Sequence, residues 1–335
     1  LGYVQNFSFG VSYQFPASTV LDVSYIGNKG TRLVSYGLDN LNQLPFGDLR
    51  LGDTLLAPLA SHPELSALTP YAGFDGTVGQ ALRAFPQYQN IGQYNPNFGM
   101  STYNSLQITA TRHFTKGLAI LAAYTWSKLL TDVTDPLDSV PGQDVGNRRL
   151  EKSVGDLNVP QTFKLTWIYE LPVGAGKVYD PGGIAGQIIG GWKVSAIQSY
   201  RSGDALALTT DLPSSAFTNL GINVRPDVVS SANQVLYNGQ GLDFVNGTPY
   251  LNRTAFVDIP TTPGGVPLRA GTAPRYLNIR GPAQYGEDFG LVKTFPFTEK
   301  RNVEFRADFA NLFNRHGLSD PDTDVSSPTF GRIFG

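Results

Sequence analysis

Apolar and polar side chains alternate along several stretches of this chain. In residues 3–15, one parity carries aromatic and aliphatic side chains, while the other carries mainly amides, hydroxyls and glycine. The apolar parity holds Tyr3, Phe7, Phe9, Val11, Tyr13 and Phe15, and the opposite parity holds Val4, Asn6, Ser8, Gly10, Ser12 and Gln14. A period of two residues is typical of a β-strand with one apolar and one polar face. The pattern therefore predicts strands.

Eight stretches show this alternation, and they fall into four sequential pairs. The predicted pairs are 3–15 with 21–25, 106–111 with 118–126, 163–169 with 192–196, and 289–295 with 303–313. Within pairs, residues 16–18, 115–117 and 296–300 are short turns, and Gly117 supplies a positive φ. Between pairs, the connections 28–103, 131–160 and 204–283 are long. Short turns at one end and long loops at the other are typical of an outer-membrane β-barrel.

The polar parity of the last strand carries three charges, Glu304, Arg306 and Asp308. Small barrels fill their interiors with packed side chains, whereas a wide barrel encloses water that can solvate charges. We therefore expect these three residues to face a water-filled lumen and the apolar parity to face lipid. Aromatic residues near the strand ends fit the girdles at the two membrane interfaces; they are Tyr3, Phe15, Trp126, Trp167, Trp192, Phe295 and Phe313. A soluble sandwich with an aromatic core remains the alternative.

Composition narrows the possible functions. The chain has 335 residues, a formal charge of −2 and no cysteine, which excludes disulfides and thiolate sites and gives no reason to expect nucleic acid as a partner. Charged residues make up 16% of the chain, against about 25% in soluble domains. No apolar run approaches the length of a transmembrane helix. The chain opens at Leu1 without an initiator Met, so we expect a processed chain or a piece of a longer one.

Motifs for catalysis are weak, and we expect no enzymatic activity and no cofactor. The run Gly174-Ala175-Gly176-Lys177 lacks both the earlier glycine and the following Ser or Thr of a phosphate-binding loop, so we interpret it as a turn. Two groups of loop carboxylates resemble calcium ligands but complete no EF-hand, and we expect no metal site. These groups are Asp132, Asp135, Asp138 and Asp144, and Asp320, Asp322 and Asp324.

One long connection carries aromatic and amide side chains suited to sugars or peptides. We take Tyr94, Asn95, Phe98 and Tyr103 as candidates for binding a solute at the cell surface. The same residue types also suit an ordinary ordered loop.

Several sequence blocks resemble the Oar-like TonB-dependent outer-membrane transporters, in the family's order and over nearly the whole chain. The blocks are residues 103–107, 112–118 and 123–128; residues 147–152, 169–174 and 190–192; and residues 280–282, 293–295, 305–314 and 326–333. One departure is Pro160-Gln161-Thr162, where relatives often have a His-Arg pair.

The resemblance implies a barrel of about 22 strands, a plug inside it, and energy supplied through TonB. It also implies an N-terminal carboxypeptidase-regulatory-like domain. We therefore expect residues 1–335 to be the C-terminal part of such a barrel, without the plug, the N-terminal domain and the final strand. Its partners would be outer-membrane lipid, TonB through regions outside this chain, and an unidentified solute.

Fold and function can then be stated as expectations. We expect an all-β, partial antiparallel transmembrane β-barrel with long extracellular loops, in the outer membrane of a Gram-negative bacterium. Because open sheet edges cannot face hydrocarbon, the chain needs the rest of the barrel or must close as an eight-stranded one. The expected function is import of a large solute of the carbohydrate, peptide or siderophore class. The alternative is a secreted or surface β-rich binding or adhesin domain.

Overall fold

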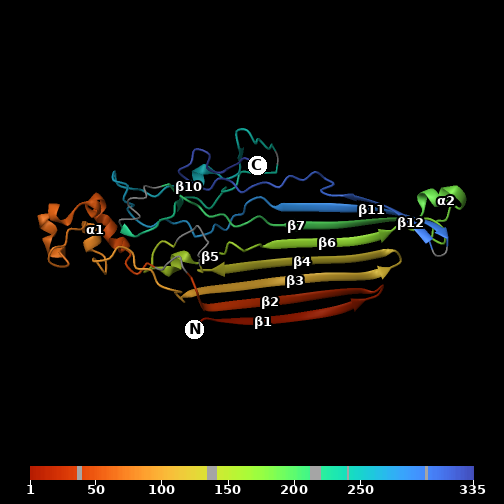
Figure 1. The fold of residues 1–335 in the computed structure, drawn as a ribbon, viewed down its shortest axis with the longest axis horizontal. Helices are drawn as coiled ribbons and strands as arrows, with labels where there is room; N and C mark the ends of the chain where they lie inside the picture. The colour runs from red at the N-terminus through yellow and green to blue at the C-terminus, as the bar shows by residue number, and fades with distance from the viewer. Residues whose placement is uncertain (36–39, 134–141, 212–219, 240, 299–300) are drawn as a thin grey trace.

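The protein is dominated by one antiparallel sheet, which fills one end of the molecule in Figure 1. The structure is a computed structural model that describes residues 1–35, 40–133, 142–211, 220–239, 241–298 and 301–335. The strands of the sheet are β1 (Tyr3–Phe15), β2 (Thr19–Leu33), β3 (Gly99–Thr115), β4 (Leu118–Thr131), β5 (Ser153–Val154), β6 (Gln161–Glu170), β7 (Trp192–Arg201), β11 (Gln284–Thr298) and β12 (Arg301–Phe309).

The strand order confirms the four predicted pairs. The sheet runs β1-β2-β3-β4-β6-β7-β11-β12, so each long strand pairs with the next one along the chain. The short strand β5 pairs with Leu130 and Thr131 of β4, beyond the stretch of β4 that β6 covers. Asn158, between β5 and β6, accepts a hydrogen bond from the Leu129 N–H at 2.6 Å. A side chain thus completes the ladder where the backbone leaves it.

Two tight turns join strands at the end of the sheet that carries the short connections. Lys116 and Gly117 have φ values of 52° and 81°, so the expected positive φ at Gly117 is confirmed. Ala17 and Ser18 also have positive φ, at 61° and 54°. Two consecutive residues with positive φ match the right-handed twist of the strands that they join. Ala17 and Ser18 adopt this conformation without a glycine, which costs free energy.

Strand lengths differ from the prediction at several ends. β2 continues to Leu33 and β3 starts at Gly99, so the first long connection is shorter than 28–103. β12 ends at Phe309 and does not reach Phe313, because the chain turns at Asn311 and Asn314, both with φ of 49°. The connection between β6 and β7 contains helix α2 (Gly183–Ile189), which the alternation did not reveal.

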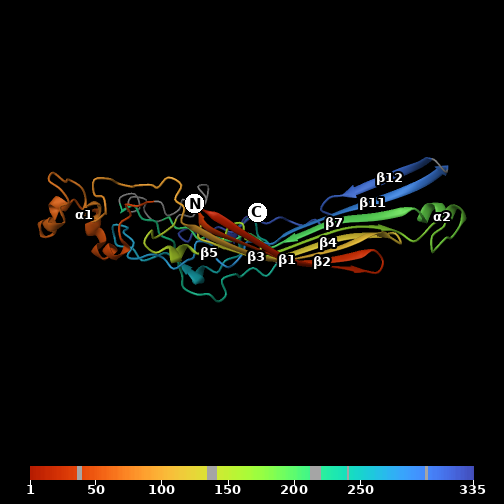
Figure 2. The same ribbon diagram turned by 90° about the horizontal axis from the view of Figure 1, so that it is seen from below.

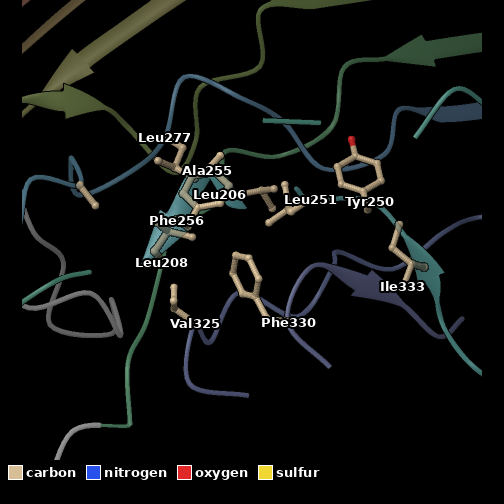
Figure 3. Packing of buried hydrophobic residues seen from close by; sticks show 11 residues of the cluster. Leu206, Leu208, Tyr250, Leu251, Ala255, Phe256, Leu277, Val325, Phe330 and Ile333 are labelled. Carbon is tan, nitrogen blue, oxygen red and sulfur yellow. The ribbon is translucent and has the colours of Figure 1, made fainter. Parts of the chain in front are cut away.

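The long connections pack against one another at the other end of the sheet and form what we call the loop layer, the described residues of 34–98, 132–160, 202–283 and 310–335. Its hydrophobic residues make two clusters. One joins Leu44, Leu49 and Leu55 to Leu220 and Ile222. The other, shown in Figure 3, joins segments around Leu206, Tyr250 and Leu277 to Val325, Phe330 and Ile333 near the C-terminus. The loop layer is therefore a packed body with its own cores.

Short elements complete the loop layer. They are α1 (Val78–Ala81), β8 (Asp227–Val228), β9 (Thr248–Pro249), β10 (Phe256–Val257) and β13 (Arg332–Ile333), with 3₁₀ turns at Phe46–Leu56, Leu59–Ser61, Pro63–Leu68, Arg148–Glu151 and Arg253–Ala255. β10 pairs with β8, and β13 pairs with β9. Among the described residues, no helix is both long enough and apolar enough to cross a membrane.

The described strands leave the sheet open, with β1 and β12 at its edges, and Figure 2 shows it from below as a curved ribbon. The possibility of a self-closed eight-stranded barrel is therefore wrong for this structure. The soluble sandwich is also wrong, because neither hydrophobic cluster of the described residues includes a residue of the eight long strands. The sheet builds no apolar core because its apolar face is turned outward.

Candidate functional site

The two faces of the sheet differ in chemistry along whole rows. One row, followed by register from β1 to β11, reads Gly10, Ser24, Gln107, Thr125, Thr162, Arg201 and Gln284. The adjacent row on the opposite face reads Val11, Val23, Ile108, Tyr124, Phe163, Tyr200 and Tyr285. The alternation seen in single strands is thus in phase across seven strands. The sheet therefore has one mainly polar face and one mainly apolar face.

The apolar face is exposed in the described structure. Phe9 keeps 71% of its surface accessible, and Trp126 keeps 59%. In β1 the apolar positions run from Phe7 to Phe15, about the 9–11 residues that a tilted strand needs to cross a bilayer. On this face Lys29 and Lys128 lie beyond the band at the end toward the loop layer. A band of this height and composition fits the hydrocarbon region of a membrane.

The polar face carries a hollow of about 430 Å³ in its half toward the loop layer. Three neighbouring strands, β3, β4 and β6, form its floor, and the segment between β5 and β6 forms a wall. The lining residues are Tyr103, Gln107, Ala123, Thr125, Ser127, Leu157, Val159, Thr162 and Lys164. The Ser127 hydroxyl donates to the Val159 carbonyl at 2.8 Å, which ties the wall to the floor.

The lining of this hollow is mainly hydrogen-bonding groups around a single ammonium group. Gln107 offers an amide, Thr125 and Thr162 offer hydroxyls, and Lys164 offers three donors. Such a lining can hold a neutral polar solute through hydrogen bonds and can attract an anionic group. The pattern of the strands predicted polar residues here, but only the register brings β3, β4 and β6 together into one hollow.

The predicted lumenal charges lie on the polar parity of β12, as expected. The Arg306 guanidinium nitrogen Nε contacts the two carboxylate oxygens of Asp308 at 3.0 and 2.9 Å. Glu304 lies opposite Thr294 in β11. Both members of the Arg306–Asp308 pair are well exposed, so the pair stabilises the fold only weakly. β12 is an edge strand, and the hollow lies several strands away, so the structure does not bring these charges to it.

The four predicted loop residues do not converge. Tyr103 lies within β3 and lines the hollow, so assigning it to a loop was wrong; the strand starts earlier, at Gly99. Tyr94 is 95% exposed on the loop layer. Asn95 has φ of 49° and turns the chain there. Tyr94 and Tyr103 therefore lie at separate places, one on the loop layer and one in the hollow.

Phe98 packs against a charged side chain at the end of the sheet toward the loop layer. The Arg148 guanidinium lies over its ring, 4.5 Å from the centroid, and also donates to the Phe98 carbonyl. The same guanidinium binds the Asp132 carboxylate at 2.7 Å, and Asp132 is buried to 6% exposure. Asp132 in turn accepts from the Met100 N–H. This cluster fastens the connection after β4 to the start of β3.

Two buried charges on the apolar face were not predicted from the sequence. Glu287 and Lys293 share the parity of Phe289 and Leu291 in β11, and both are almost fully buried. Arg315 binds Glu287 at 3.1 Å. The Lys293 ammonium donates to the Gln187 carbonyl at 2.7 Å and to the Gly190 carbonyl. The available signal was charge at positions where the alternation requires apolar residues.

A buried ionic network joins two connections of the loop layer. Arg225 and Glu151 pair at 2.8 Å, with side chains 3% and 1% exposed. Gln143 accepts from the Arg225 N–H at 2.8 Å and from the Gly271 N–H at 3.0 Å. Because each charge is paired and hydrogen-bonded, removing one partner would leave a costly buried charge. The network therefore fixes two connections of the loop layer against each other.

The loop carboxylates are engaged by protein groups. Asp322 accepts from the hydroxyls of Ser327 at 2.6 Å and Thr329 at 2.7 Å. Asp144 accepts from the Gly146 N–H at 2.8 Å. Asp135 and Asp138 lie outside the described residues. Within the described part of the chain, no three His, Asp or Glu residues are grouped so as to hold a metal ion.

These features define a class of protein. A curved antiparallel sheet has an exposed apolar band on one face and a polar, hollowed surface on the other. It carries short turns at one end and a packed loop layer at the opposite end. This combination is the architecture of an outer-membrane β-barrel.

The sequence matches the family described as outer membrane beta barrel domain over residues 1–335, and the chain belongs to that family. It is accordingly a partial barrel domain of the outer membrane of a Gram-negative bacterium. The expected fold class and location are confirmed.

Comparison with known proteins adds one structural likeness. No curated protein matches this chain. The structure of FpvA from P. aeruginosa, in an iron complex with a heterologous pyoverdine, is similar with 8% sequence identity and a TM-score of 0.41. The match covers 98% of this chain and 26% of the FpvA chain, so this chain spans about a quarter of the length of that protein.

Proposed function

We propose that residues 1–335 form the C-terminal part of the barrel of a TonB-dependent transporter that imports a large solute. The observation that carries the proposal is the mainly polar face in a sheet that its eight long strands leave open. A barrel that needs further strands is wide enough to enclose water and a plug. The Oar-like sequence blocks favour this type of transporter and supply the expectation of TonB and of a plug.

The hollow beside Tyr103 and Lys164 lies on the path that a solute would follow. It opens on the polar face, below the loop layer, and its wall comes from the connection that precedes β6. Its lining of one amide, several hydroxyls and one ammonium group suits a carbohydrate, a peptide or a chelate with anionic oxygens. We place the solute in one of these three classes.

Growth on single solutes tests the proposal. Cells that lack the protein are supplied with limiting oligosaccharides, oligopeptides or ferric siderophores, and separately with their small components. We expect loss of growth on one large solute only, and the same loss in cells that lack TonB. Uptake that persists without TonB, or unchanged growth on every solute, would contradict the proposal.

Site variants sharpen the same test. Gln107→Leu and Lys164→Met remove polar groups of the hollow, whereas Ile108→Val alters the opposite face of the same strand by one methylene group. We expect both hollow variants to raise the solute concentration needed for half-maximal uptake, with normal amounts of protein in the outer membrane. The Ile108→Val control should leave uptake unchanged. Equal effects of all three variants would place binding elsewhere.

A further inference from the structure

Helix α2 lies on the apolar side of the sheet, at its periplasmic end. Figure 1 shows it at the end of the molecule opposite α1. Its last turn contacts two residues of the apolar parity. The Lys293 ammonium donates to the carbonyls of Gln187 and Gly190, and the Trp192 indole N–H donates to the Ile188 carbonyl at 3.1 Å. Trp192 and Lys293 are cross-strand neighbours in β7 and β11.

Close backbone contacts fix this placement. At Gly191, with φ of 70°, a Cβ atom would lie 2.7 Å from the Thr294 carbonyl oxygen. At Gly190, a Cβ atom would lie 2.5 Å from the Gly174 Cα atom. Only glycine allows these approaches without a backbone shift. The end of α2 is therefore pressed between β11 and the segment that follows β6.

The outward surface of α2 is apolar and uncovered by the described residues. Ile184 is 77% exposed, Ile188 is 62% exposed and Ile189 is 45% exposed. These three positions and Ala185 share one side of the helix, and Gln187 lies on the opposite side. The isoleucines lie on the same side of the sheet as its apolar parity, which in an outer-membrane barrel faces lipid.

Lys293 explains why a helix is needed at this place. An ammonium group on the lipid-facing parity is costly in hydrocarbon unless it is paired. Here the carbonyls at the C-terminus of α2 bind it, and the rings of Trp192 and Phe295 lie 5.4 and 4.9 Å from it. A cation at a helix C-terminus and over aromatic rings is stabilised electrostatically. The helix both supplies hydrogen-bond acceptors to Lys293 and covers it, since the residue is only 2% exposed.

We propose that α2 is an interfacial membrane anchor, whose isoleucines insert among the acyl chains of the periplasmic leaflet. The partner is phospholipid, because the exposed isoleucines are continuous with the lipid-facing sheet and lie at the end of the short turns. Trp192 beneath the helix is of the residue type enriched at membrane interfaces. The anchor sets the depth of the periplasmic rim independently of any solute, so it stands apart from the proposed transport function.

Site-directed fluorescence tests the anchor, since residues 1–335 contain no cysteine and any cysteine elsewhere in the whole protein is replaced with serine. The whole protein, as its cells produce it, carries Ile188→Cys or the matched control Gln187→Cys. Each variant is labelled with an environment-sensitive dye and placed in vesicles of phosphatidylethanolamine and phosphatidylglycerol. We expect the dye at position 188 to emit at shorter wavelength and to lose most of its emission to acyl-chain spin-labelled lipid. The dye at position 187 should respond mainly to aqueous iodide.

Two outcomes would overturn the proposal. If iodide quenches both positions equally and the spin-labelled lipid quenches neither, α2 lies in water. If neither quencher reaches position 188, another part of the protein covers the helix. Retarded migration on heating in detergent gels checks that each variant is folded, and Ile184→Cys repeats the measurement at a second site on the same side.

Discussion

At the scale of single residues, Glu287 shows how a charge is accommodated on the lipid-facing parity. Its carboxylate is almost fully buried and binds Arg315, which follows the turn at Asn311 and Asn314. The Arg315 guanidinium also lies over the rings of Tyr285 and Phe313, at 5.8 and 5.9 Å. The turn that ends β12 early therefore places Arg315 beside Glu287, where it balances the buried negative charge.

Arg315→Leu should destabilise the domain and lower the midpoint of its urea unfolding. The loss arises because Glu287 keeps its charge and loses its partner. Glu287→Gln in the Arg315→Leu background should recover part of that loss, since the buried charge is gone. Urea unfolding of the protein in vesicles measures each change. Additive losses in the double variant would show that the two residues act independently.

At the scale of elements, the hairpins and the two faces of the strands determine the stability of the sheet. The β1–β2 turn uses Ala17 and Ser18 at positive φ, whereas the β3–β4 turn uses Lys116 and Gly117. A left-handed conformation costs an L-residue about 1–2 kcal/mol, and glycine and asparagine much less. The backbone of the β1–β2 turn is therefore strained at two residues, whereas glycine relieves this strain at one position of the β3–β4 turn.

Ala17→Asn combined with Ser18→Gly should stabilise the domain by about 1–2 kcal/mol, by removing this strain. Lys116→Asn is the control, because Gly117 already occupies the second position of that turn, and its gain should be smaller. The midpoint of urea unfolding reports both. A larger gain at position 116 would contradict the assignment of strain.

Ile108→Arg and Thr109→Arg place the same charge on opposite faces of β3. Ile108 lies between Val23 and Tyr124 on the apolar face, while Thr109 lies opposite Asp22 on the polar face. Arginine on the lipid face near the membrane centre costs about 2–4 kcal/mol. Beside Asp22 in the lumen it should cost little. If Thr109→Arg proves the more destabilising in vesicle unfolding, the faces are reversed.

At the scale of the whole molecule, the sheet and the loop layer are stabilised by different kinds of interaction. The sheet depends on lipid and on water in the lumen, whereas the loop layer has two hydrophobic clusters and buried ion pairs of its own. Tyr250 illustrates this interior: burial, with the nearby Asp320 and Tyr237, raises the pKa of its hydroxyl to about 12. That hydroxyl donates to the Arg280 carbonyl at 2.6 Å.

The loop layer should loosen in acid while the sheet persists. Burial raises the pKa of Asp227, but hydrogen bonds from Arg269 and Thr272 outweigh it and hold the pKa below its usual value. Its stabilisation is therefore complete above the unfolded pKa of about 3.9 and is lost as pH falls through the folded value. The protection factors of residues 220–283 against hydrogen exchange, taken relative to the intrinsic rate at each pH, should fall below about pH 4. Asp227→Asn should exchange faster at neutral pH and show a smaller acid step; an unchanged step would contradict this assignment.

Alternation along the chain predicted the eight long strands because a strand at a lipid–water boundary must place every second side chain in each medium. It also predicted that Arg306 and Asp308 share the polar parity of β12. The pattern could not predict α2, which is seven residues long and sits between two strands. Nor could it predict the hollow, since Tyr103 and Lys164 are far apart in sequence and meet only through the β3-β4-β6 register.

The sequence by itself determined the class of fold and the two faces of the sheet, because both follow from local periodicity and turn length. Only the tertiary structure decided which groups pair with the buried charges. Lys293 donates hydrogen bonds to carbonyls at the end of α2, Glu287 pairs with Arg315, and Arg225 pairs with Glu151 within the loop layer. A local sequence pattern cannot predict these partners, because each buried charge binds a donor or acceptor that only the tertiary fold brings close to it.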